Sequence, residues 1–212
     1  MNLINLKNIV MTTKKLYQGI KMSLFSAALL ITVTVAKAQR GGDGAFEQGS
    51  KTLGLSLGIG DGEGNYDDNG YNDHAGLPAF AVIYDQGVFG DVGPGTIGIG
   101  GIISGKTSWD NYSGGKATWS SFLIGVRGDY HLTILKDRNN KFDPYAGITI
   151  GARFNHYHDK ADDGSYDVSS NNSYPIVAPF IGAKYNFAEH VGVFAEASFD
   201  ISLLRAGIAF NF

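Results

Sequence analysis

The chain of 212 residues carries 17 basic and 20 acidic side chains, for a formal net charge of −3, and it has no cysteine. The acidic balance argues against nucleic acid as a partner, and the lack of cysteine excludes a fold held by disulfides. Glycine is abundant at 30 residues, about twice its usual share. This length suits one domain with a sizeable core or one closed barrel.

The amino-terminal region has the order of features of an export signal. Lysines precede an apolar run over residues 22–35, and small residues follow it at Ala36 and Ala38. This order predicts a secretory signal peptide over residues 1–38, cleaved before Gln39. A retained membrane anchor is the alternative, but the run of about 14 residues is shorter than the roughly 20 that a spanning helix needs.

Removal of residues 1–38 makes the protein more acidic. It takes five lysines and no acidic residue from the 17 and 20 of the full chain, which leaves 12 basic and 20 acidic side chains and a net charge of −8. The exported part is expected to consist of a short periplasmic segment, residues 39–50, and one domain, residues 51–212. Met11 and Met22 are alternative starting points for translation.

The rest of the chain alternates apolar and polar residues with period two, between breaks rich in glycine and aspartate. No stretch repeats apolar residues at helical spacing for three turns. The pattern predicts eight β-strands. In chain order they cover residues 51–59, 77–85, 95–108, 119–132, 144–157, 174–187, 191–199 and 202–212.

The predicted connections alternate in length along the chain. The long links comprise residues 60–76, 109–118 and 158–173, and the shorter ones residues 86–94, 133–143 and 188–190. One end of the sheet should therefore carry long polar loops and the other compact turns. This arrangement is typical of outer-membrane barrels with long external loops and short periplasmic turns.

Each predicted strand has one apolar face and one face of small and charged residues. In the fourth strand, Ile124 and Val126 share one face, and Arg127 and Asp129 share the other with His131. A soluble lipocalin-like barrel would cover its outer face with lysine, glutamate and threonine. Here the second face is mostly glycine and serine with a charge every few residues, which suits the inside of a narrow barrel. The sequence predicts an all-β, eight-stranded antiparallel up-and-down transmembrane β-barrel.

Charged residues on the inward face are expected to pair across the lumen, because unpaired charge in a confined interior is costly. Asp85 is a further candidate for this network. The six residues predicted to form it are Arg127, Asp129, Arg153, Lys184, Glu196 and Arg205.

Aromatic residues are expected to mark the two membrane boundaries, where tyrosine and tryptophan are favoured. At the turn end these are Tyr84, Tyr130, Tyr185, Phe187 and Phe212, and at the loop end Trp109, Phe154 and Phe199.

The strand motifs resemble the small OmpA, OmpX and OmpW-like outer-membrane barrels, in particular the eight-stranded barrel domains of Bacteroidota, over about residues 48–212. The motifs that carry the resemblance are residues 144–147, 151–154, 182–185 and 192–196 and the terminal aromatics Phe210 and Phe212. The resemblance implies that these aromatics are recognised by the barrel assembly machinery, after periplasmic chaperones have held the chain.

Two residues depart from the pattern of such barrels. Pro179 falls inside the sixth predicted strand, where a bulge or local break is expected because a closed barrel has no free edge. Trp119 has the inward parity of its strand unless that strand starts one residue later.

The histidines give only a weak case for metal chemistry. His156 and His158 lie two residues apart, near Asp159 and other aspartates, but two histidines without a third assured ligand do not define a metal site. Exposed loop histidines are therefore expected. His131 and His190 lie beside turns and are expected to be structural.

Other motifs do not predict a metal site or a cofactor. The acidic segment 61–70 has Tyr66 and Asn72 where an EF-hand starting at Asp61 needs glycine and glutamate. A solvated acidic loop is expected, although weak divalent-ion binding and bridging to lipopolysaccharide stay open. The glycine-rich run 98–105 lacks the lysine and helix of a phosphate-binding loop and is expected to be barrel wall.

The sequence thus predicts a non-enzymatic protein of the Gram-negative outer membrane, with a lumen sealed by paired charges and acidic external loops. Its expected partners are membrane lipid and lipopolysaccharide, and a monomer is expected. A narrow, porin-like channel or small-ligand conduit in the manner of OmpW-like barrels is the alternative. A lipid-modifying enzyme is a minor one, since no serine and histidine pair could be aligned with those of lipid A deacylases or palmitoyltransferases.

Overall fold

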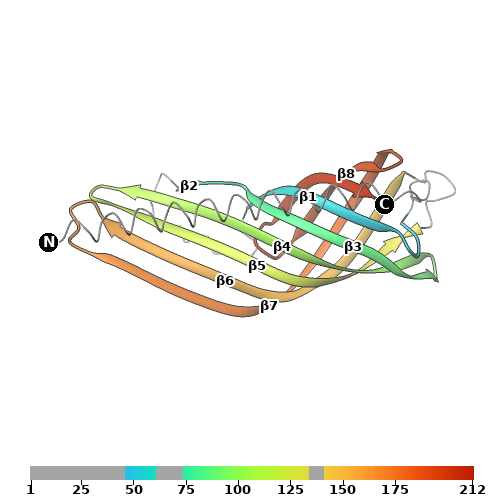
Figure 1. Cartoon of the computed structure of the whole chain (residues 1–212), viewed down its shortest axis with the longest axis horizontal. Coiled ribbons are helices and arrows are strands. Elements are labelled where there is room, and N and C mark those ends of the chain that lie inside the picture. Colours follow the sequence, from blue (N-terminus) through green and yellow to red (C-terminus); the bar gives the residue numbers. More distant parts are fainter. Residues whose placement is uncertain (1–45, 61–73, 134–140) are drawn as a thin grey trace, which may run out of the picture. The chain divides into compact units, whose positions relative to one another are not determined.

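The computed structural model describes residues 46–60, 74–133 and 141–212, all within the compact unit Gly41–Phe212. The predicted signal peptide and the acidic segment 61–70 lie outside these residues. Within them, no helix is long and apolar enough to cross a membrane. The described strands, shown in Figure 1, are β1 (Lys51–Ile59), β2 (His74–Gly76), β3 (Ala79–Val92), β4 (Gly95–Tyr112), β5 (Gly115–Leu132), β6 (Phe142–Ala161), β7 (Asp167–Ala188), β8 (Val191–Ser198) and β9 (Leu204–Asn211).

Eight of these strands close into a barrel. Their order around the ring is β4, β3, β1, β9, β8, β7, β6 and β5, and pairing of β5 with β4 completes it. All neighbouring strands are antiparallel, and the first and last strands meet with Thr52 opposite Asn211 and Ile59 opposite Leu204. The predicted eight-stranded up-and-down barrel is confirmed.

The second predicted strand, residues 77–85, corresponds to β3, and the short strand β2 precedes it within the predicted link 60–76, with Leu77 and Pro78 between them. Both strands pair with β4, and between them the Leu77 amide donates to the Thr107 carbonyl at 3.0 Å. Pro78 has no N–H to give to a ladder, so the two strands follow one line along β4 with a short interruption.

The prediction of long loops at residues 109–118 and 158–173 is wrong, because the strands continue through most of both segments. The β4–β5 ladder runs to the pair Tyr112 and Gly115, so only Ser113 and Gly114 form the turn, with Gly114 at φ 96°. The β6–β7 ladder likewise runs to Lys160 and Asp167. In Figure 1 these long strands continue side by side to the left, past the ends of β1 and β8.

The barrel therefore has two different ends. The turn end holds the tight connections at Gly93–Pro94 and Glu189–His190, and the hairpin end holds the long strands β4 to β7. At the hairpin end, β7 pairs with β8 only as far as Phe180 opposite Ser198. Beyond that pair, one edge of β7 has no strand beside it among the described residues.

Of the bulge or local break expected at Pro179, the bulge is wrong, whereas the β7–β8 ladder does end beside it, at Phe180 opposite Ser198. The β6–β7 register runs without a shift through Ile148 opposite Pro179. The Pro179 carbonyl accepts from the Phe199 amide at 3.3 Å, where β8 ends. In an antiparallel sheet the nitrogen and carbonyl of one residue point to the same neighbouring strand. The nitrogen of Pro179 therefore points away from β6 and toward the end of β8, where no ladder bond needs its missing N–H. Proline also protects an edge from pairing with another chain.

The two faces of the barrel wall have the parity expected from the sequence. Val126 is 64% exposed, whereas Arg127, the next residue, is 3% exposed. Trp119 keeps its inward parity opposite Tyr157 but is 39% exposed, because it lies in the extended sheet at the hairpin end. The outward apolar residues include Leu55, Leu57, Ile103, Ile124, Val126, Ile148, Ile150, Val177, Ile181, Val193 and Ile208.

Candidate functional site

The candidate site is the charged part of the lumen, near the turn end of the barrel. All six residues predicted for the network are buried there or next to it. They come from β5, β6, β7, β8 and β9, where alternate positions of each strand face inward. The structure divides them among three places, whereas the sequence predicted one network.

The first group, which we call the arginine cluster, consists of Arg127, Glu196, Asp200 and Arg205. Arg127 donates to both carboxylate oxygens of Glu196, at 3.1 and 2.6 Å. Arg205 lies opposite Glu196 in the β8–β9 ladder, with its Nε 3.5 Å from Oε1, and it also contacts Asp200. Two arginines and two carboxylates make this cluster neutral.

Asp200 was not among the predicted residues. It lies in the link between β8 and β9, and that link turns into the lumen, so that Asp200, Ile201 and Ser202 are all buried. Strand periodicity gives no signal for a residue in a link. Ile201 belongs to the buried apolar cluster that also contains Ile83, Leu123 and Phe194.

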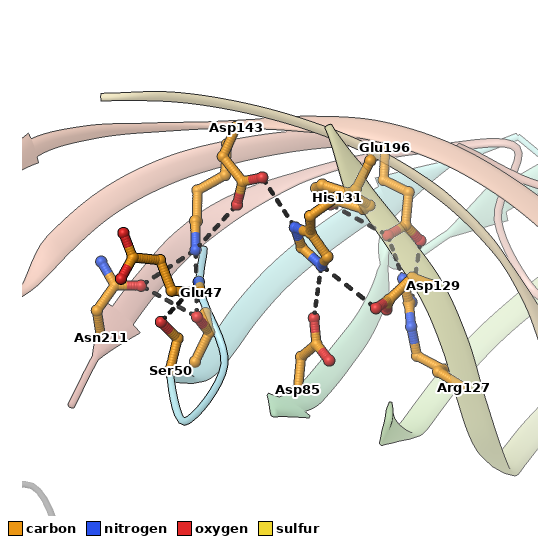
Figure 2. A network of polar contacts seen from close by, with 12 residues as sticks. Glu47, Ser50, Asp85, Arg127, Asp129, His131, Asp143, Glu196 and Asn211 are labelled. Atoms are coloured by element: carbon orange, nitrogen blue, oxygen red, sulfur yellow. Dashed lines mark hydrogen bonds and ion pairs between the residues drawn. The ribbon is translucent and has the colours of Figure 1, made fainter. Parts of the chain in front are cut away.

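The second group, which we call the histidine cluster, consists of Asp85, Asp129, His131, Asp143 and Lys184. His131 Nδ1 lies 2.8 Å from Asp143, and its Nε2 lies 3.0 Å from Asp85 and 3.3 Å from Asp129. Lys184 Nζ is 3.3 Å from Asp143. Figure 2 shows Asp143 on one side of the imidazole, with Asp85 and Asp129 on the other.

His131 has the inward parity of β5 but is not among the six residues predicted for the network. Alternation with Arg127 and Asp129 along β5 was the available signal. No such periodicity was available for Asp143, because it precedes residue 144, the predicted start of its strand. Arg153, by contrast, lies toward the hairpin end and donates to Asn155 at 3.1 Å and Ser121 at 3.3 Å.

The segment before β1 closes the lumen at the turn end. Phe46 is 2% exposed and stacks on His131 with ring centroids 3.7 Å apart, while Lys184 Nζ lies 5.3 Å from the Phe46 ring. Backbone bonds between Gly49 and Gly87 and between Gly87 and Ser50, each 2.9 Å, hold the segment in place. Phe46 was not predicted to enter the lumen.

Little free space is left among the charged groups. A cavity of about 40 Å³ remains beside Asp85, Arg127, His131, Tyr145 and Lys184. Each water in a protein cavity needs about 10–15 Å³ of such space, so this cavity holds at most a few. The side chains thus fill the lumen at this level.

The apolar outer band ends at a row of phenylalanines on the hairpin side. Phe80, Phe122 and Phe154 line an open depression of about 680 Å³. The polar residues Ser120 and His156 also line it, and they lie closer to the hairpin end than Phe122 and Phe154 do. The outward residues of β5 from Phe122 to Leu132 are apolar, apart from Gly128 and Tyr130. The outward residues before Phe122, toward the hairpin end, are polar.

Beyond this row, hydrogen bonds tie the hairpins to each other. Tyr112 donates to Asp159 at 2.5 Å and contacts the Tyr166 hydroxyl, and Tyr157 donates to the other Asp159 oxygen at 3.1 Å. The bonds with Asp159 and Tyr166 raise the pKa of the Tyr112 phenol, because they favour its neutral form.

His156 and His158 lie on the opposite face of this sheet from Asp159. His156 contacts Asn171 at 2.7 Å and His158 contacts Asp167 at 2.9 Å, so each histidine faces a different residue of β7. The structure does not bring the two histidines and Asp159 together around one point.

No protein-family model matches the chain, and no curated protein matches it. Solved structures show similarity of fold at 13% identity, over 78% of this chain and 99% of the other. They include Ail, the attachment invasion locus protein of Yersinia pestis, with a TM-score of 0.44. They also include the N-terminal β-barrel domain of OprF from Pseudomonas aeruginosa, with a TM-score of 0.45.

Proposed function

We propose that the chain is a non-enzymatic, integral outer-membrane barrel whose lumen is sealed by paired charges. One observation carries this proposal: the wall is inverted, with charged residues buried and large apolar residues exposed. Exposure of Val126 and Ile150 to water would forfeit about 25 cal/mol for each Å² of apolar surface, whereas hydrocarbon solvates the same surface. A closed barrel also satisfies every backbone group of its membrane segment internally.

The length of the apolar band supports a membrane span. On β5 it extends from Phe122 to Leu132, which is 11 residues, and a tilted transmembrane strand needs about 9–11. The closed barrel contains this segment, while the extended sheet of β4 to β7 lies past it. We propose that the extended sheet faces the outside of the cell, with the turn end in the periplasm.

A sealed lumen is proposed over an open channel, because the arginine and histidine clusters fill the interior and eight strands enclose little space. Planar bilayer recordings test this proposal. The purified barrel should give no reproducible conductance steps. Regular unit steps that change in size in Arg127→Gln would instead support a narrow channel or small-ligand conduit, the alternative function.

The extended sheet provides the surface for a role outside the membrane. Most residues of its hairpins are polar on both faces. The bonds around Asp159 hold β4, β6 and the β6–β7 turn together. We propose that the protein is a monomer and that outer-membrane lipid and lipopolysaccharide surround its barrel. We propose further that the hairpins contact surface molecules. Chemical crosslinking in intact cells should give the monomer alone, and a specific dimer band would contradict this.

A further inference from the structure

The histidine cluster places three metal-ligating groups around one point. Nε2 of His131 and carboxylate oxygens of Asp85 and Asp129 all lie within 4.8 Å of one another. A transition-metal ion binds such groups at about 2.0–2.2 Å, so small side-chain rotations bring all three onto one ion. All three residues are buried inside the barrel.

The imidazole is held in the orientation that a metal ligand needs. Asp143 lies 2.8 Å from Nδ1, and a carboxylate can only accept, so Nδ1 carries a hydrogen and donates it. Nε2 faces Asp85 and Asp129, and by the same reasoning it donates a hydrogen to Asp85 at 3.0 Å. A metal ion would take the place of this Nε2 hydrogen, because the ligating nitrogen of a histidine must be deprotonated. A carboxylate behind a ligating histidine is the usual support of metal sites, and Lys184 in turn holds Asp143.

Two buried carboxylate oxygens of this cluster are directed at Gly98, Oδ1 of Asp85 and Oδ1 of Asp129. The Asp85 oxygen has no hydrogen-bond partner, and the Asp129 oxygen has only the ion-pair contact with His131 Nε2 at 3.3 Å. Gly98 lies on β4 between the two aspartate strands, directly opposite Asp129. A Cβ on Gly98 would collide with both oxygens. The glycine therefore leaves the space in which the two carboxylates converge.

The charge of the cluster matches a divalent cation. Asp85, Asp129 and Asp143 carry three negative charges against the one positive charge of Lys184, which leaves two when His131 is neutral. The arginine cluster beside it is already neutral. An imidazolium at His131 would remove only one of the two charges, whereas one divalent ion removes both.

We propose that Asp85, Asp129 and His131 bind one divalent transition-metal ion. The mixed nitrogen and oxygen ligands suit Zn²⁺ or Mn²⁺, while Ca²⁺ and Mg²⁺ prefer oxygen alone. The ion joins β3 to β5 across β4, beneath the stacked ring of Phe46. It is a structural ion that fastens the sealed end of the lumen.

Metal binding by the purified full barrel tests this proposal. After treatment with a chelator, the protein is dialysed against buffered Zn²⁺, and bound zinc is counted by mass spectrometry. One ion per chain is expected. Co²⁺ in place of Zn²⁺ should give a visible absorption band, which reports direct ligation. Asp129→Asn removes a ligand charge at constant shape and should weaken binding at least 10-fold.

Two glycine variants provide a matched comparison. Gly98→Ala keeps all three ligands but fills the space between the carboxylates, so it should weaken zinc binding as strongly as Asp129→Asn. Gly128→Ala adds the same methyl group on the outward face of β5, where nothing lies within 4 Å, and should bind like the unaltered protein. A heat-dependent change in gel mobility checks that each variant is folded.

Several outcomes would overturn the proposal. One is the absence of saturable binding, together with no Co²⁺ band, in the unaltered barrel, a result that does not depend on how the variants fold. Another is binding that survives in both Asp129→Asn and Gly98→Ala but is lost in His158→Gln, which would assign the ion to the surface histidines. A nitrogen-15 spectrum that shows His131 as an imidazolium in saturating Zn²⁺ would likewise overturn it.

Discussion

At the scale of single residues, Glu196 joins the two arginines of the arginine cluster. It accepts from Arg127 through both oxygens, lies 3.5 Å from Arg205, and accepts from the Tyr145 hydroxyl at 3.3 Å. The Arg127 guanidinium also lies over the Phe180 ring at 3.7 Å. Glu196 therefore lies between two cations in a site that water scarcely reaches, and together with Asp200 it balances their charge.

Replacement of Glu196 by glutamine should therefore destabilise the barrel strongly. The amide has nearly the same shape but no charge, so Arg127 stays buried without an anion, and breaking such a pair costs about 3–5 kcal/mol. The free energy of unfolding in urea, measured by circular dichroism in lipid vesicles, gives the change. Glu189→Gln, in an exposed turn, should change it by less than about 0.5 kcal/mol. A similar small loss for Glu196→Gln would contradict the proposed seal.

Ile148 tests the outward face in the same way. It is 49% exposed on β6, inside the apolar band, whereas its neighbour Thr149 is fully buried in the lumen. If lipid covers this face, Ile148→Arg should cost about 2–4 kcal/mol in vesicles, the range for a cation near the middle of a bilayer. Vesicle unfolding curves measure the cost.

Val168→Arg is the matched control, because Val168 is also exposed but lies on β7 beyond the band. Water should surround it, so the arginine should change the free energy of unfolding by less than about 0.5 kcal/mol. Equal costs at Ile148 and Val168 would show that no bilayer distinguishes the two positions.

At the scale of elements, β9 closes the ring and ends the chain. It pairs with β1 along its length, and the Phe212 amide donates to the Lys51 carbonyl at 3.0 Å just past the last paired residue. We propose that the assembly machinery recognises this strand by Phe210 and Phe212, as the resemblance to small outer-membrane barrels implies.

Phe212→Ala should then lower the amount of folded barrel in the outer membrane several-fold, with little change in its unfolding free energy in vitro. Quantitative immunoblotting of the membrane fraction gives the amount. Phe199→Ala is the control, because Phe199 is an exposed aromatic at the other end of the barrel, just after β8. Equal yields from the two variants would exclude a special role for the terminal residue.

The strands and their faces could be predicted from the sequence because lipid-facing and lumen-facing residues alternate. Val126 and Arg127 show this contrast most clearly. The apolar and polar alternation ends near Trp109 and His158, where most residues on both faces are polar, so the sequence predicts loops where the strands continue. Hydrogen bonding across β4–β5 and β6–β7 continues there without an apolar face to reveal it.

The pairing of charges could not be predicted, because it depends on how far neighbouring strands are staggered around the ring. Asp129 contacts His131 on its own strand, and Arg153 lies away from both clusters. Phe46 and Asp200 reach the lumen from segments outside the strands, where period two has no meaning. The convergence of Asp85 and Asp129 over Gly98 likewise depends on three strands at once.

At the scale of the whole molecule, a closed barrel with an apolar outer band continues into the extended sheet of β4 to β7 (Figure 1). We propose that the barrel supplies the membrane span and the seal, and that the sheet supplies an outer surface. A chain without cysteine is held together here by the strand ladders and by charge pairs in the lumen. These features predict a protein that resists unfolding by detergent until it is heated.

The most direct test is the gel mobility of the protein in an isolated outer-membrane fraction. Unheated samples should contain a closed barrel that stays folded in detergent and runs faster than the same sample after boiling. Recovery in that fraction together with the shift supports both the barrel and its location. A mobility that heating never changes, or recovery only in the soluble fraction, would contradict the account.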